Sequence, residues 1–479
     1  MKKITICKGA ALATISTMLV GCGGEPSAVQ TDCCGEKPNV IVVLLDDLGS
    51  ADVGFNGCHD IPTPNIDRIA QEGANCTNAY ISAPYSGPSR AGILTGRYQQ
   101  RCGVDGNVQS YERSVEEKLG VLPEEVLLSE QLKEQGYNTC AIGKWHLGDH
   151  EDLWPQNQGF DYFYGFSGGG LSYWGAEDKS GLNYMQENGV KIEPTDQTYI
   201  TDDFSNKAVE FINNNTKTGD PFFMYLAYNA PHEGLSAPRR YLDRTTHILN
   251  PERSVYAAMI IAVDDGVGQI WDALEANGID DNTIIVFLSD NGGANYGYTQ
   301  NLPRRARKGD MYDGGTRTPF AIYWKGRIAP GTEYTNVISS LNIYATAVTA
   351  AGCDISTLER PLDGVDMIPY LSGENSGEPN NLLFWRVAGG DEYAVRKGDY
   401  KMVKCYHNDA LELYNLVEDP SEIYDIAAAN PQIIADLKQE YDGWNGQMKQ
   451  PRWLDGHMPN LIKHHELWLK VRQSRSGNR

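Results

Sequence analysis

The sequence has little positive charge, no cysteine spacing typical of a metal site and only one long apolar stretch near its start. Lysine and arginine number 41 against 63 aspartates and glutamates, so the formal net charge is −22. Such a chain would repel phosphate groups, and we therefore expect no nucleic-acid partner. The acidic excess equally serves solubility. It does not exclude an anionic substrate, because a local basic pocket can reverse the sign of the charge.

The ten cysteines include no Cys-x-x-Cys pair and no zinc-finger spacing, which argues against a cysteine metal site. Disulfides stay open for an exported chain, but the sequence does not fix their pairing. A hydrophobic fraction of 41% with 10% aromatic residues excludes a disordered chain. The length of 479 residues suits one large α/β domain with a smaller one, or two to three ordinary domains.

The N-terminus has the features of an export signal. Three lysines precede an apolar stretch over residues 10–20, which is typical of a signal peptide covering residues 1–21. The stretch ends in Leu19-Val20-Gly21-Cys22, which resembles a bacterial lipobox, in which the cysteine is acylated after cleavage. We expect a periplasmic or surface lipoprotein, anchored to a membrane only through a lipid on Cys22. Ordinary secretion is the alternative. Residues 22–37 read as a flexible tether.

Buried strands alternate with helices over most of the chain. Apolar runs predict strands, and periodic segments with capping residues predict helices that Gly73 and Gly136 help to end. The expected strands are 38–45, 137–142, 221–228 and 283–288. The expected helices are 63–73, with Thr63 as N-cap, 123–135, 202–214 and 254–276. This alternation predicts an α/β fold with a large, mainly parallel sheet and helices on both faces.

After about residue 375 the pattern changes. Residues 393–403 and 411–416 read as antiparallel strands, and 431–444 as a helix. We therefore expect a main domain over 38–375 and a smaller C-terminal sheet-and-helix subdomain over 376–479.

Polar side chains follow two of the buried strands directly. Asp46 and Asp47 end the first, and Asp290 and Asn291 follow the strand at 283–288. In parallel sheets, ligands collect beyond the carboxyl ends of the strands. An oxygen-only set of carboxylates and an amide suits a hard divalent cation. Other Asp-Asp pairs occur in the chain, but only this one caps an apolar strand.

The segment Ser86-Gly87-Pro88-Ser89-Arg90 continues through Ala91-Gly92-Ile93 to Leu94-Thr95-Gly96. It matches the signature (Cys or Ser)-x-Pro-Ser-Arg-x-x-x-Leu-Thr-Gly at every fixed position. A helix that begins near a proline explains the Pro and the Leu but not the whole combination. The region from 38 to 375 thus resembles a type I sulfatase of the alkaline-phosphatase-like superfamily.

The resemblance implies a modified nucleophile at Ser86. In that family the first signature residue is oxidised to Cα-formylglycine (3-oxoalanine), and a serine there implies an anaerobic-type maturing enzyme as a partner. An unmodified serine hydroxyl is a weak nucleophile. The hydrated aldehyde has two hydroxyls, one that attacks sulfur and one that later expels sulfate. We also expect Ser86 to begin a helix whose free N–H groups and dipole face the incoming anion.

Further segments match the family. Gly143-Lys144-Trp145-His146-Leu147-Gly148 implies that Lys144 binds a sulfate oxygen and that His146 takes a proton during sulfate release. His232, in Ala230-Pro231-His232, implies a contact to the bridging ester oxygen. Lys308 would hold the sulfate and assist the leaving group, and Arg90 would lie beside the nucleophile. The implied metal is one Ca²⁺, with ligands Asp46, Asp47, Ser86, Asp290 and Asn291.

The residues that set specificity are less visible in the sequence. Arginines 239, 240, 304, 305 and 307 are candidates for subsites that bind further anionic groups, and a solvated basic loop is the alternative. Tyr173-Trp174 and Trp385-Arg386 could stack on sugar rings, with core packing as the other interpretation.

The expected function is release of inorganic sulfate from a sulfated glycan, for instance a marine galactan such as carrageenan. The alternatives are an arylsulfatase for small esters, a phosphonate or phosphodiester hydrolase, and a non-catalytic glycan-binding lipoprotein.

Overall fold

The computed structural model describes residues 36–175, 180–193, 198–405, 410–453 and 455. The expected signal peptide, the cysteines at 22, 33 and 34 and most of the tether lie outside these residues.

A ten-stranded sheet forms the centre of the main domain, in the order β11-β2-β10-β9-β1-β8-β4-β5-β6-β7. Its five central strands, from β9 to β5, pair in parallel, and antiparallel pairs occur toward both edges. The strands are β1 (Asn39–Leu45), β2 (Ala74–Cys76), β4 (Asn138–Lys144), β5 (Tyr162–Phe166), β6 (Gln186–Glu187), β7 (Val190–Lys191), β8 (Phe222–Ala227), β9 (Thr283–Ser289), β10 (Phe320–Tyr323) and β11 (Thr332–Tyr334). A separate two-stranded sheet pairs β3 (Ala79–Tyr80) with β12 (Ile338–Ser339). The mainly parallel sheet predicted from the sequence is confirmed.

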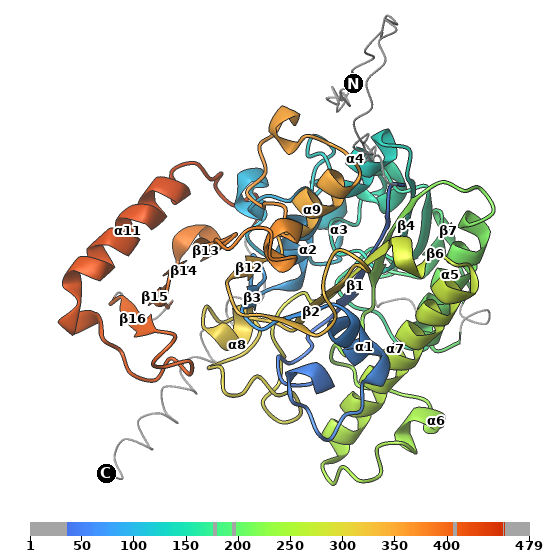
Figure 1. Cartoon of the computed structure of the whole chain (residues 1–479), viewed down its shortest axis with the longest axis horizontal. Helices are drawn as coiled ribbons and strands as arrows, with labels where there is room; N and C mark the ends of the chain where they lie inside the picture. Colours follow the sequence, from blue (N-terminus) through green and yellow to red (C-terminus); the bar gives the residue numbers. More distant parts are fainter. Residues whose placement is uncertain (1–35, 176–179, 194–197, 406–409, 454, 456–479) are drawn as a thin grey trace, which may run out of the picture.

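Helices cover both faces of this sheet (Figure 1). Alternate residues of β1 pack into two different cores: Val40, Val42 and Leu44 into one, and Ile41, Val43 and Leu45 into the other. The first core includes side chains of α2 (Ser86–Thr95), α4 (Leu128–Glu134) and α9 (Asn342–Ala350). The second includes side chains of α1 (Pro64–Glu72), α5 (Ile200–Asn215) and α7 (Pro251–Ala276). The short helices are α3 (Glu112–Glu116), α6 (Arg239–Leu242), α8 (Asp313–Thr316) and α10 (Ile368–Leu371).

The C-terminal part forms a four-stranded antiparallel sheet with one helix packed on it, as expected. The strands, in sheet order, are β13 (Leu382–Val387), β14 (Glu392–Lys397), β15 (Tyr400–Lys404) and β16 (Glu412–Asn415), and the helix is α11 (Pro431–Asn445). Figure 1 shows this unit, in orange and red, at one side of the main domain. Arg386 on β13 ties it to the main domain through a buried ion pair with Asp105, at 2.8 Å from guanidinium nitrogen to carboxylate oxygen.

Two local predictions were wrong. The helix expected over 123–135 begins only at Leu128, where the Glu130 side chain accepts a hydrogen bond from the Leu127 N–H at 3.0 Å. Glu125 instead lies in a turn and forms ion pairs with Arg97 and Arg360. Thr63 precedes α1, but its hydroxyl donates to Asp67 and does not accept from the N–H groups of the first turn.

The thiols of the described cysteines are all free, and five of the six are buried. Within the described ranges, no helix combines the length and apolarity that crossing a membrane requires.

Candidate active site

Two parallel strands bring the predicted metal-binding residues together. Leu45 at the end of β1 lies opposite Ser289 at the end of β9. The residues that follow each strand, Asp46 and Asp47 on one side and Asp290 and Asn291 on the other, are therefore neighbours and buried. The Asn291 amide nitrogen donates to Asp47 Oδ1 at 2.7 Å. Asp47 has a φ of 63°, a left-handed conformation that turns the chain sharply after the strand.

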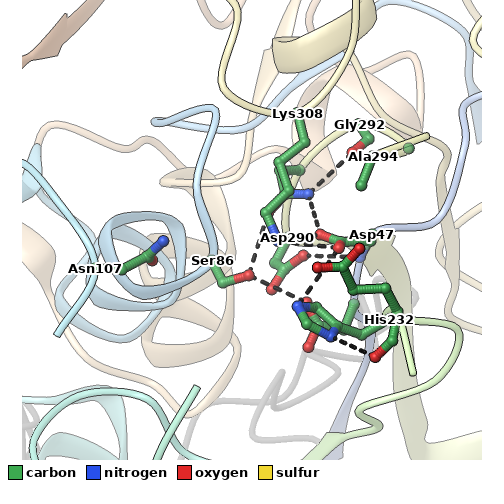
Figure 2. A network of polar contacts seen from close by, with 12 residues as sticks. Asp47, Ser86, Asn107, His232, Asp290, Gly292, Ala294 and Lys308 are labelled. Atoms are coloured by element: carbon green, nitrogen blue, oxygen red, sulfur yellow. Dashed lines mark hydrogen bonds and ion pairs between the residues drawn. The ribbon is translucent and has the colours of Figure 1, made fainter. Parts of the chain in front are cut away.

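Ser86 begins α2 and faces these residues (Figure 2). Its hydroxyl oxygen lies 3.1 Å from Asp46 Oδ1 and 3.2 Å from Asn291 Oδ1. The side chain is 1% exposed and lines a cavity, so an incoming group reaches it only from that side.

Three cations contact the carboxylates. Lys144 Nζ lies 2.5 Å from Asp46 Oδ2, and Lys308 Nζ lies 2.7 Å from Asp47 Oδ1. Arg90, which is fully buried, donates two hydrogen bonds to Asp290 Oδ2, at 3.1 and 2.8 Å, and one to the Lys144 carbonyl oxygen, at 2.9 Å.

This pairing determines the protonation of the carboxylates. Burial alone would raise the pKa of Asp46, but Lys144, His232 and Arg90 hold it below its usual value. Burial acts in the same way on Asp47, and Lys308 is the main group that lowers its pKa. For Lys144, burial outweighs the pull of Asp46 and lowers the pKa of the ammonium group. Both aspartates are thus ionised near neutral pH.

The oxygen atoms at this point fit a hard dication. Three carboxylates, the amide oxygen of Asn291 and the hydroxyl of Ser86 converge, and calcium prefers an all-oxygen set. Ligand atoms of Asp46, Asp47 and His232 lie within 4.8 Å of one another, which brings His232 to the same place. Arg90, Lys144 and Lys308 together only balance the three aspartates, so a dication would make the site positive toward an anion.

His146 lies on the wall of the same cavity. Its Nε2 atom is 3.0 Å from the carbonyl oxygen of Val108, and its buried Nδ1 atom has no hydrogen-bond partner among the described residues. Burial, with Lys144 and Arg90 nearby, holds the pKa of His146 well below its ordinary value. The ring is therefore neutral, and since a carbonyl oxygen can only accept, Nε2 carries the proton and Nδ1 has a free lone pair.

His232 follows β8 and lies beside Asp47 (Figure 2). Its Nε2 atom lies 3.6 Å from Asp47 Oδ2, and its side chain is 22% exposed. The hydroxyl of Tyr173 lies 2.8 Å from the Asn229 carbonyl oxygen and 2.9 Å from that of His232, so it links the ends of the turn that carries the histidine.

The cavity has a volume of about 740 Å³ and is lined by both parts of the chain. The main domain supplies the charged residues around Ser86, and the C-terminal sheet adds Glu392 and Cys405. Tyr296 and Arg307 lie on the cavity wall too, with the guanidinium 4.9 Å from the ring centre. The sequence had suggested Trp385-Arg386 as the contribution of the C-terminal unit, and it did not point to Glu392 or Cys405.

Only some of the arginines that were candidates for substrate specificity line the cavity. Of the five arginines, Arg305 and Arg307 line the cavity, and Arg305 also reaches across to Tyr414 of β16. Arg239 and Arg240 pair with Asp243 and Asp202 outside the lining, and Arg304 donates to backbone carbonyl oxygens.

The aromatic candidates lie outside the cavity lining. Trp385 and Tyr173 are buried and serve packing and positioning, and Trp174 is half-exposed.

The expectation of free N–H groups at the start of α2 was wrong for two residues. The Gly87 N–H donates to Asn107 Oδ1 at 2.9 Å, and Pro88 has no N–H to offer. Asn107 and Val108, on the same loop, were not singled out from the sequence, because no motif surrounds them and the contacts they make are far away in the chain.

Comparison with known proteins agrees with this geometry. The Sulfatase family model matches residues 38–353, and the model for the C-terminal part of N-sulphoglucosamine sulphohydrolase matches residues 306–445. The chain is 31% identical to the uncharacterized sulfatase YdeN of Escherichia coli (strain K12), with 84% of each chain covered. It is 31% identical to N-acetylgalactosamine-6-sulfatase of Mus musculus, over 76% of this chain and 72% of the mouse protein.

Among solved structures, Ps i-CgsB superposes with a TM-score of 0.81 at 35% identity, covering 88% of this chain and 95% of the other. A second structure of that protein holds k-i-k-neocarrahexaose. With two thirds of its residues in the Sulfatase family model and an intact signature at Ser86, the chain belongs to the sulfatase family and is an enzyme of that class.

Proposed function

We propose that this sulfatase releases inorganic sulfate from a sulfated glycan, with the oxidised form of Ser86 as nucleophile and a bound Ca²⁺. The observation that carries the proposal is the position of Ser86. Its hydroxyl contacts Asp46 and Asn291 at the end of a cavity whose lining includes Lys144, Lys308 and His146.

The shape of the cavity supports a carbohydrate substrate. A volume of about 740 Å³ lies within the range of pockets that enclose a molecule of several rings. Tyr296 and Arg307 both line the cavity, with the guanidinium over the ring, so the lining offers an aromatic group for a sugar ring and a cation for an anionic substituent. The similarity to Ps i-CgsB, whose structure holds k-i-k-neocarrahexaose, favours a carrageenan-type galactan.

In the proposed reaction, the chain's own residues bind the sulfate and move protons. Lys144 and Lys308 bind its oxygens, and Arg90 holds Asp290 in place. One hydroxyl of the hydrated aldehyde on Ser86 gives its proton to Asp46, whose Oδ1 lies 3.1 Å from the Ser86 oxygen, and forms a bond to sulfur as the bond to the glycan oxygen breaks. Lys308, in the cavity lining, gives that oxygen a proton, and His232, in the same lining, contacts it. His146 Nδ1 then takes the proton of the second hydroxyl, the carbon–oxygen bond to sulfate breaks, and the aldehyde forms again.

Asp46, Asp47, Asp290, Asn291 and the modified Ser86 would hold Ca²⁺. When bound, the ion withdraws charge from the sulfate oxygens as a Lewis acid.

Two further proposals concern maturation and location. Oxidation of a serine implies an anaerobic-type maturing enzyme as a partner, and we expect activity only from chains produced together with one. Cys22 is proposed to carry a lipid that anchors the exported protein. Incorporation of labelled palmitate that is lost in Cys22→Ser would support this anchoring, and no incorporation by the unaltered chain would contradict it.

A panel of substrates tests the proposed function. Matured protein is incubated with sulfated galactan and glycosaminoglycan oligosaccharides, a small aryl sulfate and a phosphonate ester, and released sulfate or phosphonate is measured. Higher kcat/KM on an oligosaccharide than on the aryl sulfate supports the glycan assignment. Preference for the aryl sulfate or for the phosphonate ester would replace the glycan assignment with the matching alternative. If none of the substrates is hydrolysed, a glycan-binding role is favoured.

A further inference from the structure

Asn107 lies beside Ser86 in the wall of the cavity, on the loop between the short helical turn Gln99–Cys102 and α3. In Figure 2 it lies on the opposite side of Ser86 from Asp47 and Lys308. The residue is 7% exposed, so more than nine tenths of it is buried.

The orientation of the amide is fixed by its hydrogen bond. The Gly87 N–H can only donate, so the atom 2.9 Å away is the amide oxygen, Oδ1. The Nδ2 group must then point away from the start of α2, and no described residue accepts a hydrogen bond from it. The Nδ2 group is open to the cavity, so an acceptor on a ligand can replace the water that it would otherwise contact.

The loop is held at both sides of this residue. The Asn107 N–H donates to Asp455 Oδ2 at 3.1 Å, and the Trp453 indole N–H donates to the Asn107 carbonyl oxygen at 2.9 Å. The next residue, Val108, contacts His146. A side chain on such a braced loop is placed before any ligand arrives, as a substrate-binding group requires.

We propose that Asn107 Nδ2 donates a hydrogen bond to a non-bridging oxygen of the sulfate group held over Ser86. The Gly87 N–H at the start of α2 polarises the amide of Asn107 by donating to Oδ1. This makes Nδ2, which faces the cavity, a stronger hydrogen-bond donor. Sulfate oxygens only accept, so a neutral donor at this point favours them without adding charge. The proposal rests on the proposed sulfatase reaction and adds one residue that contacts its substrate.

Asn107→Asp keeps an oxygen for the Gly87 N–H but replaces the donor and adds a negative charge. Asn107→Ala, which removes the donor without adding charge, is therefore measured beside it and must also lose kcat/KM and sulfate inhibition if the donor is the cause. Asn188→Asp is the matched control, since Asn188 Oδ1 also accepts a hydrogen bond from a backbone N–H, that of Phe163 at 2.8 Å, and Asn188 lies outside the cavity lining. For each chain, kcat, KM, inhibition by inorganic sulfate, the thermal midpoint and the oxidised fraction of Ser86 are measured.

We expect Asn107→Asp to lower kcat/KM by about 10- to 100-fold and to weaken sulfate inhibition by a similar factor, as for loss of a hydrogen bond to a charged group. The thermal midpoint and the oxidised fraction should match those of the unaltered chain, and Asn188→Asp should change kcat/KM by less than about threefold. Unchanged kcat/KM and inhibition in Asn107→Asp would overturn the proposal.

A binding measurement separates this proposal from the proposed function. If the unaltered chain releases no sulfate from any ester, calorimetry with inorganic sulfate still compares it with Asn107→Asp. Binding by the unaltered chain that weakens about 10-fold or more in the variant supports the contact from Asn107 even then. Equal binding by both chains, or by neither, would overturn it.

Discussion

The Nε2 atom of His146 lies 3.0 Å from the carbonyl oxygen of Val108. This contact assigns the proton of the neutral ring to Nε2 and leaves the Nδ1 lone pair without a hydrogen bond. Val108 belongs to the loop that Trp453 and Asp455 hold in place. The protonation of His146, the base of the proposed reaction, therefore depends on its contact with the Val108 loop as well as on the segment that contains it.

His146→Ala should lower kcat by about 10²- to 10⁴-fold, because the proton of the second hydroxyl loses its acceptor. KM should change much less. Steady-state sulfate release checks this, with His150→Ala as the control: His150 is absent from the cavity lining, and its ring accepts a hydrogen bond from Asp152. Similar kcat values for the two variants would show that His146 is not the base.

Lys308→Ala should lower kcat/KM by about 10²- to 10³-fold. The ammonium group contacts Asp47 and holds down the pKa of that carboxyl, so its loss raises the pKa of Asp47 and removes a cation facing the sulfate. Lys325→Ala, which removes an exposed lysine paired with Asp281, is the matched control. If kcat/KM fell equally in both variants, the cause would be the lower positive charge of the whole protein and not the position of Lys308.

Removal of Ca²⁺ should abolish activity, since the cations at the site only balance Asp46, Asp47 and Asp290. Activity is measured after treatment with a chelator and again after Ca²⁺ is added back, and a chelator already saturated with Ca²⁺ serves as the control. Full activity of the metal-free chain would contradict the calcium assignment.

Arg386→Ala should destabilise the protein by about 3–5 kcal/mol, because Asp105 would be left buried and unpaired. The double variant Arg386→Met with Asp105→Leu should lose less, since no buried charge remains. Thermal midpoints of the two variants test this, and the same midpoint for both would show that the unpaired carboxylate is not the cause.

Asp264 makes stability depend on pH. Burial raises the pKa of Asp264 to about 7, although it accepts hydrogen bonds from Asn65 and Ile66 at the start of α1. The folded chain then keeps a proton that the unfolded chain loses above its usual pKa of 3.8, so stability falls as pH rises from about 4 to about 7. The effect is on the order of 4 kcal/mol. Thermal midpoints across this range should fall less in Asp264→Asn, and parallel curves would contradict the assignment.

Much of the site could be predicted because its residues directly follow strands or lie in one continuous motif. Asp46 and Asp290 come together because parallel strands end at the same edge, which is a property of the sheet. The loop residues could not be found in this way. Asn107 gains its role from a hydrogen bond to Gly87, and Glu392 reaches the cavity only because β13 to β16 pack against the main domain.

The wrong helix start has a similar cause. Pro123, Glu124 and Glu125 satisfy the local rules for a first turn. Tertiary ion pairs from Arg97 and Arg360 hold Glu125 in a turn instead, and Glu130 caps the helix farther along the chain. Neither arginine is close in sequence, so local propensity gave the wrong boundary.

The state of Ser86 is the most direct test of the proposed reaction. Mass spectrometry of the peptide that contains Ser86 is combined with sulfate release from the same preparation, for the chain and for Ser86→Ala. We expect the peptide to be lighter by two hydrogen atoms, activity to rise in proportion to the oxidised fraction, and Ser86→Ala to fold but release no sulfate. Full activity from a chain whose Ser86 is unmodified, or turnover by Ser86→Ala, would contradict it.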